Sequence, residues 1–393
     1  MAFDKLVNPE QSPFFNWSKP FVQLETTRGC FNTCAFCVSG GEKPVRTLSV
    51  EAIRERVRLI HEKGIRNIRV LDRTFNYQSH RAKALFDLFR EFPDMRFHLE
   101  IHPALLSEEL KQELASMPKG LLHLEAGIQS LHEEVLTVSR RAGKLADALE
   151  GLRYLCALDN METHADLIAG LPLYHLSQIF DDVRTLAEYR AGEIQLESLK
   201  LLPGTEMRRR AEELGICYSP LPPYEVLQTR EITPDELQTA RQLSRLLDGF
   251  YNAPAWQEIT RRLIVEEPDF LTRFLDHLIQ IGVIDQPMGL ERRGILLYHF
   301  CKEHYPLFLT AMSRAWIEAG MSLKKEPAER VRTKHVTPPE AWTVCTGTYR
   351  DDLRLCKLPA PEEGRCYWYG FETESQQLRP VFAAVSEELT PAP

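Results

Sequence analysis

Residues 21–37 read FVQLETTRGCFNTCAFC, a short strand-like run followed directly by three closely spaced cysteines. Apolar Val and Leu alternate with polar Gln and Glu over residues 22–25, the pattern of a strand with one buried face. The next residues form a loop at the carboxyl end of that strand, and this loop holds Cys30, Cys34 and Cys37. Because parallel β/α barrels carry out their chemistry on this edge, the loop is the first candidate site.

The composition is that of a globular protein. The chain has 393 residues, 44% of them hydrophobic, with a formal charge of −8 from 48 basic and 56 acidic residues. This mild acidity argues against broad binding of nucleic acid or anionic membrane. No apolar run approaches the roughly 20 residues that span a bilayer, and the first residues, MAFDKLVNPEQSPFFNW, lack the regions of a signal peptide. We therefore expect a cytoplasmic protein with no membrane partner.

The chain beyond residue 20 alternates β-like runs with helical patterns, the order of parallel strands joined by right-handed crossovers. Six strands are expected, at residues 21–26, 66–72, 95–101, 121–128, 162–168 and 193–199. Helical spacing of apolar residues occupies 49–63, 79–91, 107–116, 144–158 and 177–189, and several of these stretches begin with a serine that can cap the first turn. A doubly wound sheet or a barrel would both give this order.

Strand polarity favours the barrel. Strands of a doubly wound sheet are covered on both faces and are almost continuously apolar, whereas these alternate, with polar sets Gln23 and Glu25; His98, Glu100 and His102; His123, Glu125 and Gln129; and His164 and Asp166. Period two places each set on one face. With helices on the apolar face, we expect the polar face to line the lumen of an open barrel; a sheet with one wet face is the alternative.

The pattern changes after about residue 215. Three prolines interrupt residues 220–223, and helical stretches follow at 234–249, 254–265, 269–281 and 294–319. Charge and proline then rise, and aromatic residues and three scattered cysteines mark a small β-rich or extended appendage. We expect an N-terminal extension at 1–18, a barrel at 19–215, a helical domain at 216–322 and the appendage at 323–393.

Three thiolates in eight residues suggest one metal centre. A structural zinc site usually has four ligands, and His61 or His80 could supply a distant fourth. A cubane iron–sulfur cluster held by three cysteines instead leaves one iron free to bind a substrate. Incidental burial of the three thiols is the third possibility, and the iron–sulfur interpretation is favoured over both.

The Cys-x3-Cys-x2-Cys spacing after the first strand of a six-fold β/α repeat resembles the radical S-adenosylmethionine (SAM) superfamily, whose fold is a partial (β/α)6 barrel. The resemblance implies that Cys30, Cys34 and Cys37 hold a [4Fe–4S] cluster whose open iron chelates SAM, and that Phe36 packs near the adenine. It implies an enzyme that cleaves SAM reductively and abstracts hydrogen from a substrate with a 5′-deoxyadenosyl radical. An electron donor such as flavodoxin or ferredoxin would be a partner.

Later segments extend the resemblance. EAGIQS at 125–130 with Arg140 looks like the superfamily's fourth-strand segment, DLIAGLP at 166–172 its fifth, and LKLLPGT at 199–205 the turn after its sixth. The segment after the second strand, LDRTFN at 71–76, stands where a glycine-rich element binds the amine of SAM. The resemblance thus implies cofactor contacts from Asp72, Thr74, Glu125, Arg140 and Asp166.

These segments, with PPYEVL at 222–227, are most similar to a cobalamin-associated branch that carries a helical domain after the barrel. The cobalamin-binding domain of that branch precedes the barrel, whereas about 18 residues precede the first strand here. Cobalamin would therefore act only if another chain supplied it or if this sequence is part of a longer protein. Cobalamin-assisted methyl or alkyl transfer in trans is one alternative function, and a non-catalytic iron–sulfur or zinc protein is another.

Among the lumen residues, Glu100 and His102 lie nearest the expected active mouth and are the candidate catalytic groups for binding or deprotonating a substrate. Glu197 and Lys200 on the sixth strand are further candidates, of which one can point inward. The sequence does not distinguish a lipid, peptide, metabolite or nucleoside as substrate, and the acidic balance makes a nucleic-acid partner the weaker choice.

Overall fold

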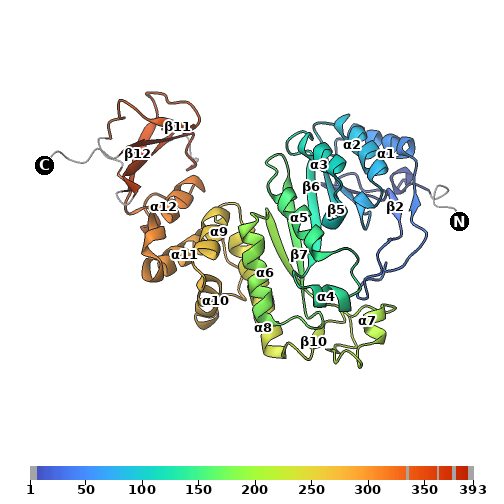
Figure 1. Cartoon of the computed structure of the whole chain (residues 1–393). Helices are drawn as coiled ribbons and strands as arrows, with labels where there is room; N and C mark the ends of the chain where they lie inside the picture. Colours follow the sequence, from blue (N-terminus) through green and yellow to red (C-terminus); the bar gives the residue numbers. More distant parts are fainter. Residues whose placement is uncertain (1–6, 333–335, 361–362, 374–377, 388–393) are drawn as a thin grey trace. The chain divides into compact units, whose positions relative to one another are not determined.

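The computed structural model describes residues 7–332, 336–360, 363–373 and 378–387 (Figure 1). The chain divides into two compact units, Met1–Leu247 and Asp248–Pro393. The first unit contains the cysteine loop and a parallel sheet; the second contains helices and an antiparallel sheet.

The sheet of the first unit confirms the α/β fold expected from the sequence. Its six strands follow chain order and pair in parallel: β1 (Val22–Leu24), β4 (Asn67–Val70), β5 (Arg96–Ile101), β6 (Leu122–Gln129), β7 (Glu162–Ala169) and β8 (Glu193–Ser198). Within the described residues β1 and β8 are the edges of this sheet and do not pair with each other, as in a partial barrel. All six carboxyl ends therefore lie along one rim.

Register brings the polar side chains of neighbouring strands together. His98 of β5 lies opposite His123 of β6, and Glu100 opposite Glu125. The intervening apolar residues are buried on the helix-covered face. The polar face lines a cavity of about 710 Å³ bordered by β1 and β4–β8, so the structure has a lined lumen and not merely one wet face.

Helices pack outside the sheet: α1 (Val50–Glu62), α2 (Ser79–Arg90), α3 (Glu108–Ala115), α5 (Leu145–Cys156) and α6 (Leu176–Glu188) (Figure 1). The short α4 (Glu133–Val138) lies at the strand ends, where the backbone N–H of Ala35 in the cysteine loop donates to Ser139 O. Serine caps are present where the chain enters α1 and α3: Ser49 Oγ accepts from the backbone N–H of Ala52, and Ser107 Oγ from that of Leu110. The expected caps at residues 79 and 177 are wrong, because each serine lies inside its helix.

The first unit continues past the sixth strand. Short α7 (Glu206–Arg209) precedes the hairpin of β9 (Cys217–Tyr218) and β10 (Val226–Gln228), and α8 (Pro234–Leu246) packs on α6 and β8. The backbone N–H of Val226 donates to Leu199 O, which ties this hairpin to the end of β8. The compact unit that holds the sheet thus includes the first part of the expected helical domain.

The second unit contains α9 (Gln257–Glu266), α10 (Phe270–Gln280), α11 (Leu290–His304) and α12 (Leu309–Glu318). The single helix expected at 294–319 is wrong, because the chain breaks at Tyr305 and Pro306 cannot supply the backbone N–H that a continuous helix needs. A four-stranded antiparallel sheet follows, in the order β11 (Thr343–Thr346), β14 (Phe382–Glu387), β13 (Arg365–Phe371) and β12 (Arg354–Ala360). Cys356 and Cys366 pack in different apolar clusters of this sheet, and Cys345 is exposed.

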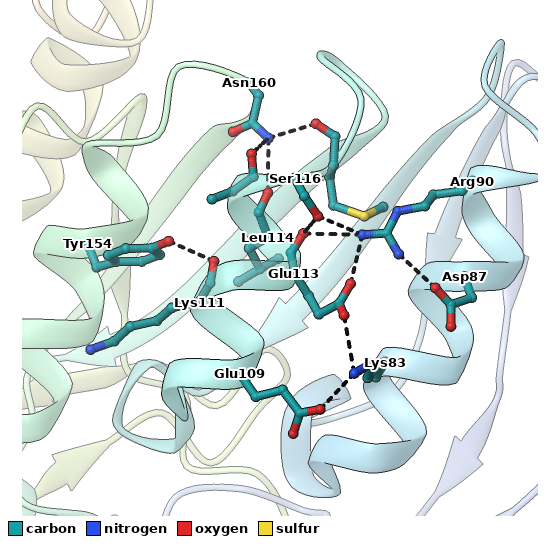
Figure 2. Close-up of polar contacts among 12 residues, drawn as sticks. Lys83, Asp87, Arg90, Glu109, Lys111, Glu113, Leu114, Ser116, Tyr154 and Asn160 are labelled. Carbon is teal, nitrogen blue, oxygen red and sulfur yellow. Dashed lines mark hydrogen bonds and ion pairs between the residues drawn. The ribbon is translucent and has the colours of Figure 1, made fainter.

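Polar contacts join α2 and α3 on the outside of the sheet, as Figure 2 shows. Arg90 of α2 donates to Glu113 Oε2 at 2.8 Å and to Ser116 Oγ at 2.9 Å. Asn160, in the turn before β7, donates to the carbonyl oxygens of Leu114 and Met117 at 2.9 and 2.8 Å. Leu114 lies in the last turn of α3, where backbone acceptors have no intrahelical donor, and Met117 lies two residues beyond the helix. Asn160 therefore joins the end of α3 to the start of β7.

Asn160→Ala removes the donor to both carbonyls, and we expect it to lower the free energy of unfolding by about 1–2 kcal/mol. Urea unfolding followed by circular dichroism measures the change. Lys83→Ala is the matched control, since Lys83 forms ion pairs in the same network through an exposed side chain and should cost less than about 1 kcal/mol. Equal losses in the two variants would contradict the capping role of Asn160.

Candidate functional site

The cysteine loop is held closed by its own backbone. The N–H of Cys37 donates to Cys34 O, and that of Gly40 to Cys37 O, each at 3.1 Å. At the base, the N–H of Cys30 donates to Glu42 O at 3.1 Å, and β2 (Thr27–Arg28) pairs with β3 (Arg46–Thr47). The loop thus returns to its starting point between Cys30 and Glu42 and directs its thiols to one cavity.

Two glycines make this closure possible. A Cβ at residue 40 would lie 2.6 Å from Cys34 O. Gly29 has φ +99°, and a Cβ there would lie 2.5 Å from Glu42 O. Any larger residue at either position would push the two arms of the loop apart.

The three cysteines line one cavity of about 180 Å³ at the rim of the sheet. The cavity contains most of the site residues expected from the sequence, drawn from the loop and the ends of four strands: Cys30, Cys34, Cys37, Phe36, Thr74, Glu100, His102, Glu125 and Asp166. His61 and His80, the alternative zinc ligands, are not among its lining residues. His61 lies on α1 and pairs with Asp94 at 2.9 Å.

Asp72 does not reach this cavity, contrary to expectation. Its carboxylate is buried and accepts from the backbone N–H of Thr26 at 2.7 Å and of Thr27 at 2.8 Å, and from the Thr26 hydroxyl. Burial raises the pKa of this carboxyl. The side chain therefore joins the end of β4 to the end of β1 instead of facing a ligand. Thr74, two residues later, does line the cavity, with its hydroxyl 3.9 Å from Cys30 Sγ.

Arg140 is also misplaced by the sequence prediction. Its side chain is half exposed and pairs with Glu206 outside the cavity. The adjacent Arg141 lines the cavity instead: its guanidinium donates to Gly127 O, and Nη1 lies 3.7 Å from Cys34 Sγ. Two consecutive arginines at the end of a helix point in different directions, and sequence spacing did not identify which one faces inward.

Gln129 is a cavity residue whose role the sequence did not reveal. Register shifts between Gly127 and Gln129, and Gln129 has φ +72°. This bulge turns its amide back over Gly127, where a Cβ would lie 2.5 Å from Gln129 Nε2. A non-glycine residue in the left-handed region is an uncommon conformation that concentrates at functional sites. The bulge and the close approach at Gly127 place the Gln129 amide beside Arg141.

Three carboxylates line the cavity from adjacent strands. Burial and the nearby Glu125 charge raise the pKa of Glu100 to about 7, although Arg73 lies 3.7 Å away. The hydrogen bond from His98 Nε2 at 2.8 Å lowers the pKa of Glu125. Burial raises the pKa of Asp166, whose Oδ1 lies 2.9 Å from His164 Nε2. The three groups thus have different proton affinities, and Glu100 changes charge near neutral pH.

His102 faces the cavity as a neutral ring. Its Nε2 donates to Ala142 O at 3.0 Å, and the backbone at residue 102 exchanges two hydrogen bonds with the Asn76 side chain. Burial, with the Arg141 charge, lowers the pKa of His102 to about 3. Nδ1 has no hydrogen-bond partner within the described ranges. The arrangement makes His102 an acceptor for a ligand group and not a proton donor.

The lumen adjoins this cavity, since Glu100 and Glu125 line both spaces. Its walls include His98, His123 and His164, and β8 contributes Glu193 and Gln195. Glu197 and Lys200, the expected inward candidates on that strand, line neither cavity; they lie 4.0 Å apart with exposed side chains.

Residues 24–186 match the family model of the radical SAM superfamily. The chain contains a radical SAM domain. Members of this superfamily use a [4Fe–4S] cluster and SAM. Residues 212–312, which follow the radical SAM match, correspond to a family described as a protein of unknown function, DUF4080.

Curated relatives match part of the chain. A tRNA-2-methylthio-N(6)-dimethylallyladenosine synthase of Herpetosiphon aurantiacus is 27% identical over 213 residues, which cover 49% of this chain and 47% of the relative. The synthase of the same name from Chlorobium limicola is 30% identical over 154 residues, covering 36% and 34%. The chain thus spans half or less of the length of these relatives.

Solved structures give weaker likenesses. The radical SAM methyltransferase TsrM from Kitasatospora setae aligns with 55% of this chain and 43% of its own, at 17% identity and a TM-score of 0.45. The cobalamin-dependent radical SAM enzyme OxsB aligns with 75% of this chain and 53% of its own, at 14% identity and a TM-score of 0.42. Within the described residues no helix has the length and apolar character needed to cross a membrane.

The residues of the cavity fit the cofactors of the superfamily. Three thiols converge from one closed loop, with two of them buried and the third half-buried. Burial raises the pKa of Cys34, and the Arg141 guanidinium beside it acts in the opposite direction. This donor set suits iron, which thiolates hold in iron–sulfur clusters. Arg141, Gln129, Thr74 and Asp166 supply polar groups around the thiols for a charged cosubstrate.

Glu100→Gln tests the buried carboxyl. Because the pKa of folded Glu100 is raised from 4.5 to about 7, the folded state keeps a proton that the unfolded chain releases, and wild-type stability falls as pH rises through this window. In protein prepared without cluster, the free energy of unfolding of wild type should fall between about pH 5 and pH 7.5. We expect the fall in the variant to be smaller by about 1–2 kcal/mol. Urea unfolding at both values measures this, with Glu62→Gln on the surface as control. Parallel pH profiles for wild type and Glu100→Gln would contradict the assignment.

Proposed function

We propose that Cys30, Cys34 and Cys37 hold a [4Fe–4S] cluster and that the chain cleaves SAM reductively to abstract a hydrogen atom from a substrate in the lumen. The observation that carries the proposal is the convergence of the three thiols with Arg141, Gln129 and Asp166 on one cavity at the strand rim. When bound, the cluster supplies the electron that breaks the sulfonium bond of SAM and so generates the 5′-deoxyadenosyl radical.

Different residues around the thiols suit different chemical groups of SAM. Arg141 is a fixed cation whose charge suits a carboxylate. The Thr74 hydroxyl and the Asp166 carboxylate are acceptors that suit an ammonium group, and the Gln129 amide can both donate and accept. Phe36 supplies an apolar surface in the same cavity for the adenine.

The lumen is the proposed substrate site. Glu100 and Glu125 line both the lumen and the cysteine cavity, so a molecule bound in the lumen would lie next to SAM. Hydrogen abstraction depends on the position of the substrate carbon, so these residues act by orienting the substrate and excluding water. Glu100 and the neutral His102 are the groups that contact substrate or cosubstrate in this scheme. A small reductant protein such as flavodoxin or ferredoxin delivers the electron.

The first test is anaerobic reconstitution with iron and sulfide, reduction with dithionite and assay of 5′-deoxyadenosine and methionine by mass spectrometry. We expect both products from wild type. In Cys34→Ala the amount of 5′-deoxyadenosine should fall at least about 100-fold, because the two remaining thiolates do not hold the cluster. Cys217→Ala is the matched control, since Cys217 is exposed and lies in the β9 hairpin. Wild-type protein that contains the cluster and binds SAM but forms no 5′-deoxyadenosine under any reductant would contradict the proposal.

Two adjacent arginines provide a second test. In cluster-containing protein, Arg141→Ala should weaken SAM binding by about 10- to 100-fold through loss of a charged hydrogen-bond donor. Arg140→Ala should leave the Kd for SAM within about twofold, because its side chain pairs with Glu206 outside the cavity. Equilibrium dialysis with labelled SAM measures both constants. If Arg140→Ala weakened SAM binding more than Arg141→Ala, Arg140 and not Arg141 would be the residue that contacts the SAM carboxylate.

A further inference from the structure

The lumen holds a second group of metal-ligating side chains away from the cysteines. His123 is the second residue of β6, His164 the third of β7 and Glu193 the first of β8. His164 lies opposite Glu193 in register, and His123 opposite the residue two positions before His164. The three side chains therefore share the lumen face of three adjacent strands near their amino ends.

Their ligand atoms converge. One nitrogen from each imidazole and one Glu193 carboxylate oxygen all lie within 4.8 Å of one another. Metal bonds to such ligands are about 2.0–2.2 Å long, so ligand atoms around a bound ion lie about 3–3.5 Å apart. Small rotations of the side chains would bring the triad to this spacing. The surrounding cavity of about 710 Å³ leaves space for further ligands on the ion.

Each of the two imidazoles has one ring nitrogen without a well-formed hydrogen bond. His164 is only 4% exposed. Nε2 of His123 and Nε2 of His164 are buried and, in the described part of the chain, neither has a hydrogen bond of acceptable geometry. Nε2 of His164 does lie 2.9 Å from Asp166 Oδ1, an atom that also has no hydrogen bond of good geometry there. Unsatisfied buried nitrogens are costly, and a metal ion is one ligand that would satisfy them.

We propose that His123, His164 and Glu193 form a mononuclear site for a divalent transition metal ion, separate from the cysteine loop and located in the lumen. Two imidazoles and one carboxylate favour ions such as Zn²⁺, Fe²⁺ or Co²⁺ over Mg²⁺ or Ca²⁺, which prefer oxygen ligands. The ion would lie where the proposed substrate lies, and its open positions would bind an oxygen or nitrogen donor of that molecule.

Arg96 opposes this binding and so provides a specific test. Its guanidinium donates to His123 Nδ1 at 2.9 Å and also binds Glu162 at 2.6 Å. A neutral ring that accepts at Nδ1 carries its proton on Nε2, so coordination through Nε2 requires the ring to give up the Arg96 hydrogen bond. Arg96 would keep Glu162 as its partner.

The experiment uses the full chain with its cluster assembled anaerobically. Protein is dialysed against buffered Zn²⁺, and zinc and iron are measured by mass spectrometry at equal iron content. We expect one zinc per chain in wild type, with affinity at least about 100-fold lower in His164→Ala and in Glu193→Gln. Glu193→Gln is the conservative variant, because glutamine can keep the hydrogen bond from Gln195 Nε2. His61→Ala, on α1 outside the lumen, is the matched control and should bind zinc as wild type does.

Arg96→Gln should bind zinc about tenfold more tightly, because it removes both a competing donor and a positive charge. Weaker binding in that variant would overturn His123 as a ligand. Absence of zinc uptake by wild type, or equal uptake by His164→Ala and Glu193→Gln, would overturn the site. Zinc is counted directly, and 5′-deoxyadenosine is assayed on portions of the same preparations that are taken before zinc is added. Failure of the metal site and failure of the proposed SAM chemistry are therefore separate results.

Discussion

The carboxylate of Asp72 holds the chain where β1 ends and the cysteine loop begins. It accepts from two consecutive backbone N–H groups and one hydroxyl at residues 26 and 27 while buried from solvent. The N–H of Thr26 lies between the end of β1 and the start of the β2–β3 pairing at Thr27, so neither strand pairing gives it an acceptor. The contact ties the end of β1 to the end of β4 at the point where the cysteine loop leaves the sheet.

The polar lumen is the second constraint on the fold. Aligned parallel strands with one polar face place histidines and carboxylates in adjacent rows, which an apolar core would not tolerate. Pairing limits the cost: His98 binds Glu125, and Arg73 lies beside Glu100. The pairing is incomplete, because several imidazole nitrogens of the described residues lack hydrogen bonds. A lumen of this kind is expected to take a ligand, since packing alone would be better served by Val, Ile and Leu.

Several features of the fold were predictable because they depend on local patterns. Period-two alternation identified the six strands and their inward residues, and helical spacing identified the intervening helices. The break at Pro306 was present in the sequence as a proline and was missed because apolar spacing continues on both sides of it. In the candidate site, Cys-x3-Cys-x2-Cys predicted a shared metal centre, and the structure brings these cysteines to one cavity with six of the eight other expected residues.

The sequence alone determined the order of strands, the face on which polar residues lie and the concentration of thiols in one loop, because each is set by residue spacing along the chain. Only the tertiary structure decided which side chains at the strand ends face the cavity. It directed Arg141 inward and Arg140 outward, turned Asp72 toward a backbone and away from a ligand, and rotated Gln129 through a bulge. It also brought His123, His164 and Glu193 together from three strands. The physical reason is that side-chain direction at a strand end, and convergence across a sheet, depend on contacts between residues far apart in sequence.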